Sequence, residues 1–193
     1  TKCERTGRQI MITLVAGVTL FFGIHMLPAF SLNAGLVDKF GEAPYKMSFS
    51  VISFAGLGFI IYGFQLADFV PLWSPTSWGR SLTMGVMPFA IILVVAANGP
   101  NNIRHFVRHP MLIGITLWGA LHLTANGDLA STILFASFLC FFILDIVLVE
   151  TRGRFQPQEP VSVVWDIGVV LAGCVLYGRL YYFHGSFTGM PLV

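Results

Sequence analysis

Six long apolar stretches run along the chain, and most polar positions are confined to the segments between them. Crossing the hydrocarbon core of a bilayer takes a helix of about 20 mostly apolar residues. Strands of a membrane barrel would instead alternate apolar and polar residues over about ten positions. The pattern therefore predicts an all-α polytopic membrane bundle of about six transmembrane helices. The predicted spans cover residues 11–37, 47–67, 81–103, 110–124, 129–149 and 161–182.

Proline, glycine and short polar residues lie within these spans and at their ends. Pro110 suits the first turn of a helix, and Pro88 is expected to kink the third span. Gly99 and Pro100 are expected to stop that span, and Asp128 to cap the fifth after a tight turn. Small residues inside the spans predict close helix packing in lipid. They are Gly56, Gly58, Gly63, Gly114, Gly119, Gly168 and Gly173.

Composition restricts the class of protein further. Hydrophobic residues make up 55% of the 193 residues and charged residues 10%, whereas a soluble domain carries roughly 25% charged residues. The mean hydropathy is +0.78, which also excludes an intrinsically disordered chain. The net charge is +2 without a basic block, so we expect no nucleic-acid partner. The lipid bilayer is the partner that the composition predicts.

The first ten residues differ from the rest. They are polar, and the first apolar stretch begins at Met11. We interpret residues 1–10 as an upstream extension or a cloning remnant and residues 11–193 as one transmembrane domain.

Lysine and arginine in loops predict the orientation in the membrane. Those after the first, third and fifth spans are Lys39, Lys46, Arg104, Arg108, Arg152 and Arg154. Those on the other side are Arg80 and Arg179, joined by Lys2, Arg5 and Arg8 if the first ten residues are native. Without these ten residues, the count places the loops after the odd-numbered spans in the cytoplasm.

Two histidines lie within predicted spans, His25 in the first and His122 in the fourth. Neutral imidazole is a good axial ligand of haem iron, and helical bundles build such sites from facing helices. The alternative is that each is a hydrogen-bonded histidine of the helix bundle. The three cysteines are widely spaced and form no haem attachment motif, so a haem would be held non-covalently. Cys140 and Cys174 are expected to be buried, because they lie in apolar stretches.

Arg108 and His109 immediately precede the fourth span. Free amides and the positive end of a helix dipole attract an anion at such a position, and Arg104 adds charge four residues away. The alternative is that these cations only anchor the loop on the cytoplasmic side. On the sixth span, Asp166 and Arg179 lie about 20 Å apart, so each is expected to find a partner on another helix or to reach the interface.

Several of these segments carry a family resemblance. Residues 108–114 (RHPMLIG), 117–122 (LWGALH) and 125–130 (ANGDLA) resemble the NnrU family of bacterial membrane proteins. Gly23 to His25 with Pro28, Gly41 with Glu42, and residues 184–191 also match that pattern. The NnrU family is related to the plant 15-cis-zeta-carotene isomerases. More distantly, its Arg-His-Pro-x-x-x-Gly block resembles that of the membrane isoprenylcysteine methyltransferases.

The resemblance implies a haem b cofactor with His25 and His122 as axial ligands of the iron. It implies a supporting or substrate-side role for His109, which we take together with Arg108 as the candidate catalytic residues. The implied reaction is the cis–trans isomerisation of an apolar polyene that enters from the lipid. The implied location is the inner (cytoplasmic) membrane of a bacterium.

Two other functions stay open from the sequence. One is a haem sensor or accessory factor in nitrite and nitric oxide metabolism, which binds nitric oxide without turnover and works alone or as a subunit of a larger membrane assembly. The other is a methyltransferase that binds S-adenosylmethionine near Arg108 and His109. The tail lacks the acidic residue that the methyltransferase resemblance would require after the last span.

Overall fold

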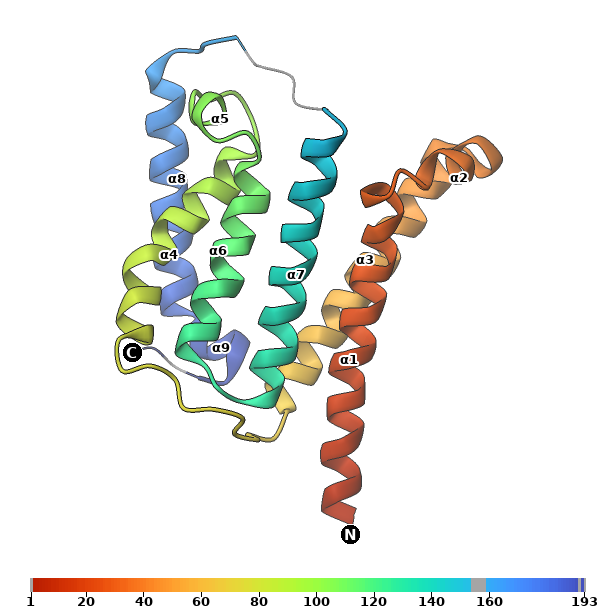
Figure 1. The fold of residues 1–193 in the computed structure, drawn as a ribbon, viewed down its shortest axis with the longest axis vertical. Helices are drawn as coiled ribbons and strands as arrows, with labels where there is room; N and C mark the ends of the chain where they lie inside the picture. Colours follow the sequence, from red (N-terminus) through yellow and green to blue (C-terminus); the bar gives the residue numbers. More distant parts are fainter. Residues whose placement is uncertain (1, 154–158, 191, 193) are drawn as a thin grey trace. The chain divides into compact units, whose positions relative to one another are not determined.

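The computed structural model describes residues 2–153, 159–190 and 192, with side chains from Gly7 onward. Within these residues the secondary structure consists of helices, turns and one isolated β-bridge, so the predicted all-α class is confirmed. The helices are α1 (Lys2–Ala29), α2 (Asn33–Phe40), α3 (Glu42–Leu66), α4 (Gly79–Ala96), α5 (Ile103–Phe106), α6 (Pro110–Ala125), α7 (Leu129–Thr151), α8 (Val163–Tyr182) and α9 (His184–Thr188) (Figure 1).

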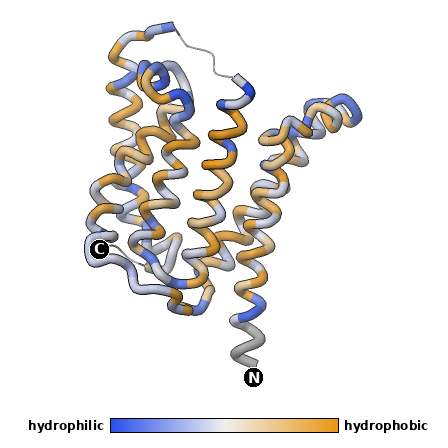
Figure 2. Tube along the Cα trace, in the orientation of Figure 1, coloured by the Kyte–Doolittle hydropathy of each residue, from blue (hydrophilic) through white to orange (hydrophobic). Residues whose placement is uncertain are grey.

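Five of the described helices are long and apolar enough to cross a membrane, which makes the chain a multi-pass membrane protein. These spans are Gly7–Ala29, Glu42–Leu66, Gly79–Ala96, Leu129–Thr151 and Val163–Tyr182. The predicted fourth span corresponds to α6, which is apolar but has only 16 residues. At 1.5 Å per residue it reaches about 24 Å, somewhat less than the roughly 30 Å of hydrocarbon. Figure 2 shows hydrophobic residues along the length of these helices.

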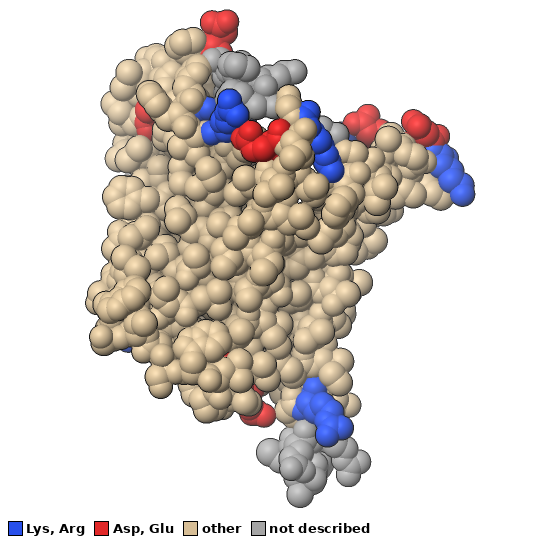
Figure 3. All heavy atoms as spheres, in the orientation of Figure 1, with Lys and Arg blue, Asp and Glu red and all other residues tan. Residues whose placement is uncertain are grey.

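Charged side chains lie near the helix ends. In the view of Figure 3, lysine, arginine, aspartate and glutamate gather toward the top and the bottom, and other residues cover the middle. This distribution is what a lipid environment requires, because a charge in the hydrocarbon is costly. Arg154, part of the predicted cytoplasmic charge, lies outside the described residues.

The first predicted span, residues 11–37, is wrong at its carboxyl end. α1 ends at Ala29, and Ser31 adopts a left-handed conformation with φ 58°. The Leu32 N–H donates to the Leu27 carbonyl at 2.7 Å, and the Ser31 N–H donates to the carbonyl three residues back at 3.1 Å. These bonds form a Schellman motif, which satisfies the last carbonyls of α1 and turns the chain into α2.

The third predicted span, residues 81–103, also ends early. α4 stops at Ala96, and Gly99 follows with φ 76°. The amide of Asn101, which is 1% exposed, donates to the Ala96 carbonyl at 2.8 Å. This buried side chain supplies a partner to the helix end in place of the next turn.

The chain divides into two compact units, Thr1–Val70 and Pro71–Val193. In the first unit α1 packs along α3. A methyl group on Gly56 would lie 2.8 Å from the Phe21 nitrogen, and one on Gly63 would lie 2.6 Å from the Leu14 nitrogen. These glycines let the two backbones touch, as predicted. Gly58 does not take part, since nothing lies within 4 Å of its position for a methyl group.

In the second unit α4 packs against α6 and α8, and α6 packs against α7. The predicted glycines Gly114, Gly119 and Gly173 each lie against a neighbouring helix. Gly168 faces open space, so its predicted packing role is wrong. Cys140 and Cys174 are exposed rather than buried, because lipid tails replace protein neighbours on the outer helix faces.

The turn between α6 and α7 agrees with the prediction. Asp128 caps α7, and its Oδ2 accepts a hydrogen bond from the Ser131 N–H at 2.9 Å. The Gly127 carbonyl accepts from the N–H groups of Leu72 and Trp73. The carbonyl of Trp73 lies where a side chain on Gly127 would have to be, so glycine is required there.

Candidate functional site

His25 lies one turn before the end of α1, with its side chain half-buried. Its Nδ1 is 2.6 Å from the Phe21 carbonyl oxygen on the same helix. The ring stacks on Phe21 with centroids 4.3 Å apart and meets the ring of Phe49 edge-on at 4.9 Å. α3 supplies Phe49, so both helices of the first unit hold this imidazole.

His122 lies near the end of α6, and its surroundings repeat this arrangement. Its Nδ1 is 2.8 Å from the Trp118 carbonyl oxygen, again one turn back on the same helix. The ring stacks on Phe135 of α7 with centroids 4.5 Å apart. Trp118 lies 5.1 Å from the imidazole and contacts Phe135 and Phe138 edge-on. Aromatic rings from two helices therefore enclose His122 in the second unit.

The two histidines share one tautomer. A carbonyl oxygen only accepts hydrogen bonds, so Nδ1 carries the proton in both rings and Nε2 carries the lone pair. Histidines that ligate metals commonly donate the other ring N–H to a carbonyl, which fixes the ring and strengthens the ligand. The donor chemistry of both rings thus fits an axial ligand of haem iron. His25 belongs to the first unit and His122 to the second.

Arg108 and His109 meet at a carboxylate that the sequence analysis missed. Arg108 Nη1 lies 3.0 Å from Glu150 Oε2, and His109 Nε2 lies 3.1 Å from Glu150 Oε1. The His109 side chain is 14% exposed, whereas those of Arg108 and Glu150 are 59% and 42% exposed. Glu150 thus orients the less exposed imidazole and neutralises charge beside it. The signal that could have found it is an acidic residue at the end of a span that is followed by a basic loop.

Asp166 has a partner outside its own helix, as predicted, but this partner lies in the loop before α5 and not on another helix. Its Oδ1 accepts from the Asn102 backbone N–H and its Oδ2 from the Asn102 side-chain amide, both at 2.7 Å. Asn102 also exchanges hydrogen bonds with the backbone of Val161. The loop before α6 is thereby tied to the start of α8, on the side of the second unit where Arg108 and His109 lie.

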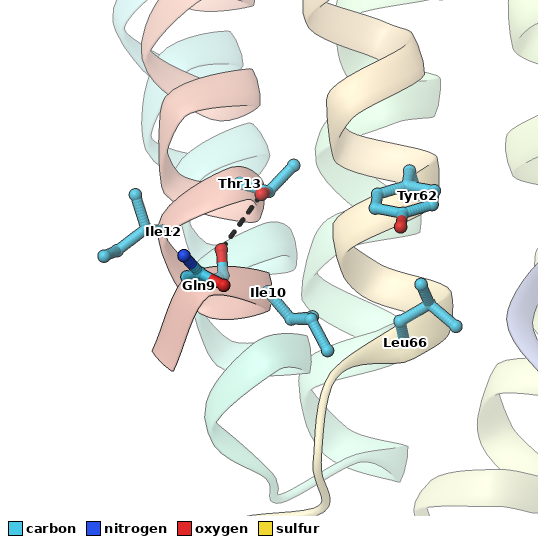
Figure 4. A pocket seen from close by; sticks show the side chains of 6 residues that line it. All are labelled: Gln9, Ile10, Ile12, Thr13, Tyr62 and Leu66. Carbon is cyan, nitrogen blue, oxygen red and sulfur yellow. Dashed lines mark hydrogen bonds between the residues drawn. The ribbon is translucent and has the colours of Figure 1, made fainter. Parts of the chain in front are cut away.

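One groove lies in the first unit, between the start of α1 and the end of α3 (Figure 4). Its lining residues are Gln9, Ile10, Ile12, Thr13, Tyr62 and Leu66. Thr13 donates to the Gln9 carbonyl at 2.9 Å within α1. The lining includes none of the predicted site residues. Among the residues that the structure describes, no three His, Cys, Asp or Glu side chains cluster as ligands of a metal ion.

Helices of this length and apolar character, with two imidazoles embedded in them, define a polytopic helical membrane protein. The chain belongs to the NnrU protein family, whose pattern matches residues 13–192. The predicted family resemblance is thereby confirmed over nearly the whole chain. No curated protein and no solved structure matches the chain.

Proposed function

We propose that this NnrU protein binds haem b in the membrane, with His25 and His122 as the axial ligands of the iron. The observation that carries the proposal is the common tautomer of the two rings, each with Nδ1 bonded to the carbonyl one turn back. In both rings this bond leaves Nε2 as the nitrogen that could face a ligand. Both Nε2 atoms carry the lone pair that ligation needs.

The surroundings of the imidazoles support this role. The bond from Nδ1 to the carbonyl restricts rotation of each ring and raises the basicity of Nε2. Around His122, the rings of Trp118, Phe135 and Phe138 exclude water and offer flat apolar surfaces to a macrocycle or a polyene. Haem, when bound, would supply an iron that can lend electron density to a conjugated chain and lower the order of one double bond.

We propose cis–trans isomerisation of an apolar polyene as the reaction. Rotation about one double bond adds and removes no atoms, so the chain needs no site for a polar co-substrate. The polyene would enter from the lipid, as the apolar outer faces of the helices favour. Arg108 and His109, held by Glu150 at the membrane boundary, would line the site on the side where the substrate lies. The proposed location is the inner membrane of a bacterium.

The first experiment measures haem binding. The full chain is purified in detergent with haem b, and its iron content and reduced-minus-oxidised spectrum are recorded. We expect His122→Ala and His25→Ala each to weaken haem binding by about tenfold or more, because a direct ligand is lost. His105→Ala, which removes a histidine of α5, is the matched control and should bind haem normally. Wild-type protein that takes up no haem would refute the proposal.

The second experiment separates isomerisation from the alternatives. Membranes containing the reduced protein are incubated with a poly-cis carotenoid precursor, and the isomers are resolved by chromatography. Conversion that requires His122 supports the isomerase. Haem binding without conversion, but with a nitric oxide adduct, would favour the sensor or accessory factor of nitric oxide metabolism. Methyl transfer from S-adenosylmethionine that survives both histidine substitutions would favour the methyltransferase.

A further inference from the structure

The second unit begins with a segment outside the helices, residues 71–78, which we call the 71–78 loop. Its backbone is bonded to the end of α6 and to the turn that follows. The N–H groups of Leu72 and Trp73 donate to the Gly127 carbonyl at 2.8 and 3.1 Å. The Thr76 hydroxyl donates at 3.5 Å to the carbonyl of the penultimate residue of α6. The loop is therefore held across one end of this helix.

The side chains of the 71–78 loop are unusual for a connection in water. The loop contains no charged residue, and Leu72, Trp73 and Trp78 are 51%, 41% and 56% exposed. Apolar surface in water is unfavourable, whereas irregular backbone at membrane depth is tolerated where the protein pairs its polar groups. The loop combines a backbone that is paired with the bundle and apolar side chains that face outward.

The length of α6 indicates the depth of this loop. α6 has 16 residues and reaches about 24 Å, whereas α7 and α8 have 23 and 20 residues and reach about 35 and 30 Å. With its first residue at one boundary of the hydrocarbon, α6 ends about 6 Å short of the other boundary. The 71–78 loop covers that end, so it lies where the membrane still continues.

The carboxyl-terminal helix α9 adds aromatic side chains to the same end of the second unit, as Figure 1 shows. Tyr182, Phe183 and Phe187 are 71%, 49% and 55% exposed. The tail after α9 is fixed to α4, because Arg80 Nη2 donates to the Leu192 carbonyl at 3.3 Å. Tryptophan and tyrosine are enriched where a membrane protein meets the headgroup layer.

The charges at this end also fit phospholipid. In the described segments 71–83, 120–132 and 177–190, the exposed formal charges are those of Arg80 and Arg179. The acidic residue of these segments, Asp128, is 3% exposed. Arginine at the interface extends its guanidinium toward the phosphates of the lipids. The exposed surface is thus apolar, aromatic and positively charged.

We propose that the 71–78 loop and α9 form a lipid-binding surface that lies in the headgroup and glycerol layer of the bilayer. Leu72 and Trp73 contact the first carbons of the acyl chains, and Arg80 and Arg179 bind phosphates. This layer is hydrated, so its residues stay within reach of water-soluble reagents. The inference is independent of haem and of any turnover.

The test measures the depth of Trp73 by fluorescence quenching. The full chain, with Trp78, Trp118 and Trp165 replaced by phenylalanine, is reconstituted in phosphatidylcholine vesicles whose acyl chains carry bromine near the headgroup or near the terminal methyl. We expect the shallow bromine to quench Trp73 about twofold more strongly than the deep bromine. The control carries Glu159→Trp and no native tryptophan; Glu159 is exposed at the opposite end, and neither lipid should quench it.

A second measurement leaves the tryptophans in place. Leu72→Cys, with the native cysteines replaced by alanine, carries a nitroxide spin label in the same vesicles. Its collisions with oxygen, which concentrates in the membrane, are compared with its collisions with a water-soluble nickel chelate. We expect a higher ratio of oxygen to nickel collisions than for a label at Glu159→Cys. Circular dichroism checks that each variant keeps its helices.

Two results would overturn the proposal. If brominated lipids leave Trp73 unquenched while iodide quenches it as strongly as the tryptophan of the control, then the loop projects into water. If neither the lipids nor iodide quench Trp73, and the label at residue 72 collides with neither reagent, then protein covers the loop, and a second copy of the chain becomes the expected occupant.

Discussion

Pro88 lies inside α4, where a proline removes one backbone N–H from the helix. The carbonyl left without its usual donor is that of Met84, four residues earlier. Tyr177 of α8 supplies the missing donor, since its hydroxyl donates to the Met84 carbonyl at 3.0 Å. A polar group left unpaired at membrane depth is costly. The bond from Tyr177 therefore joins α8 to α4 at the carbonyl that lacks its helical hydrogen bond.

We expect Tyr177→Phe to lower the free energy of unfolding by about 1 kcal/mol, because the Met84 carbonyl loses its donor. In a Pro88→Ala background, the N–H of residue 88 can bond that carbonyl, and the same substitution should cost clearly less. Unfolding in detergent of the four proteins of this double-mutant cycle measures the coupling. Equal costs of Tyr177→Phe in both backgrounds would show that the proline is irrelevant to this bond.

Helix packing in the first unit depends on which glycines face the neighbouring helix. Gly56 and Gly58 are two residues apart on α3 and have the same helix propensity. A methyl group would lie 2.8 Å from the Phe21 backbone at Gly56 and would meet nothing within 4 Å at Gly58. The contact differs, and so the consequences of the same substitution should differ.

We expect Gly56→Ala to destabilise the protein by about 1–3 kcal/mol, because α1 must move away from α3. Gly58→Ala is the matched control, and it should be neutral or stabilising by up to about 1 kcal/mol through helix propensity. Thermal unfolding of both variants in the same detergent measures the difference. Equal stability of the two variants would contradict close packing at Gly56.

The sequence predicted those elements that depend on residues close together along the chain. Apolar runs located every long helix, and Asp128 was recognisable as a cap because its partner is three residues away. The end of α1 was missed because Ser31, not glycine, takes the left-handed position of the Schellman motif. Glu150 was missed because its partners lie more than 40 residues away, and no periodic pattern links them. His25 and His122 were recognisable as polar residues within apolar spans, but their hydrogen bonds to carbonyls one turn back depend on the folded helix.

In the whole second unit, charges divide between its two ends. Arg104, Arg108, Asp145, Glu150, Arg152 and Asp166 lie toward the end where α4 finishes and α6 begins. Arg80, Asp128 and Arg179 lie toward the opposite end. Orientation follows lysine and arginine in short loops rather than net charge, so the acidic partners do not cancel the basic residues. The end with Arg104, Arg108 and Arg152 is therefore expected to face the cytoplasm.

Accessibility of single cysteines tests this orientation. Phe106 of α5 is 88% exposed at the predicted cytoplasmic end, and Trp78, which precedes α4, is 56% exposed at the other. With the three native cysteines replaced by alanine, a membrane-impermeant maleimide added to intact spheroplasts should label Trp78→Cys and spare Phe106→Cys. Both should react once the membrane is opened, which controls for burial.

The reverse labelling would invert the orientation and place Arg108, His109 and Glu150 on the outer side. Since arginine in short loops is held back on the cytoplasmic side, that result would mean that the amino-terminal residues Lys2, Arg5 and Arg8 outweigh the loops of the second unit.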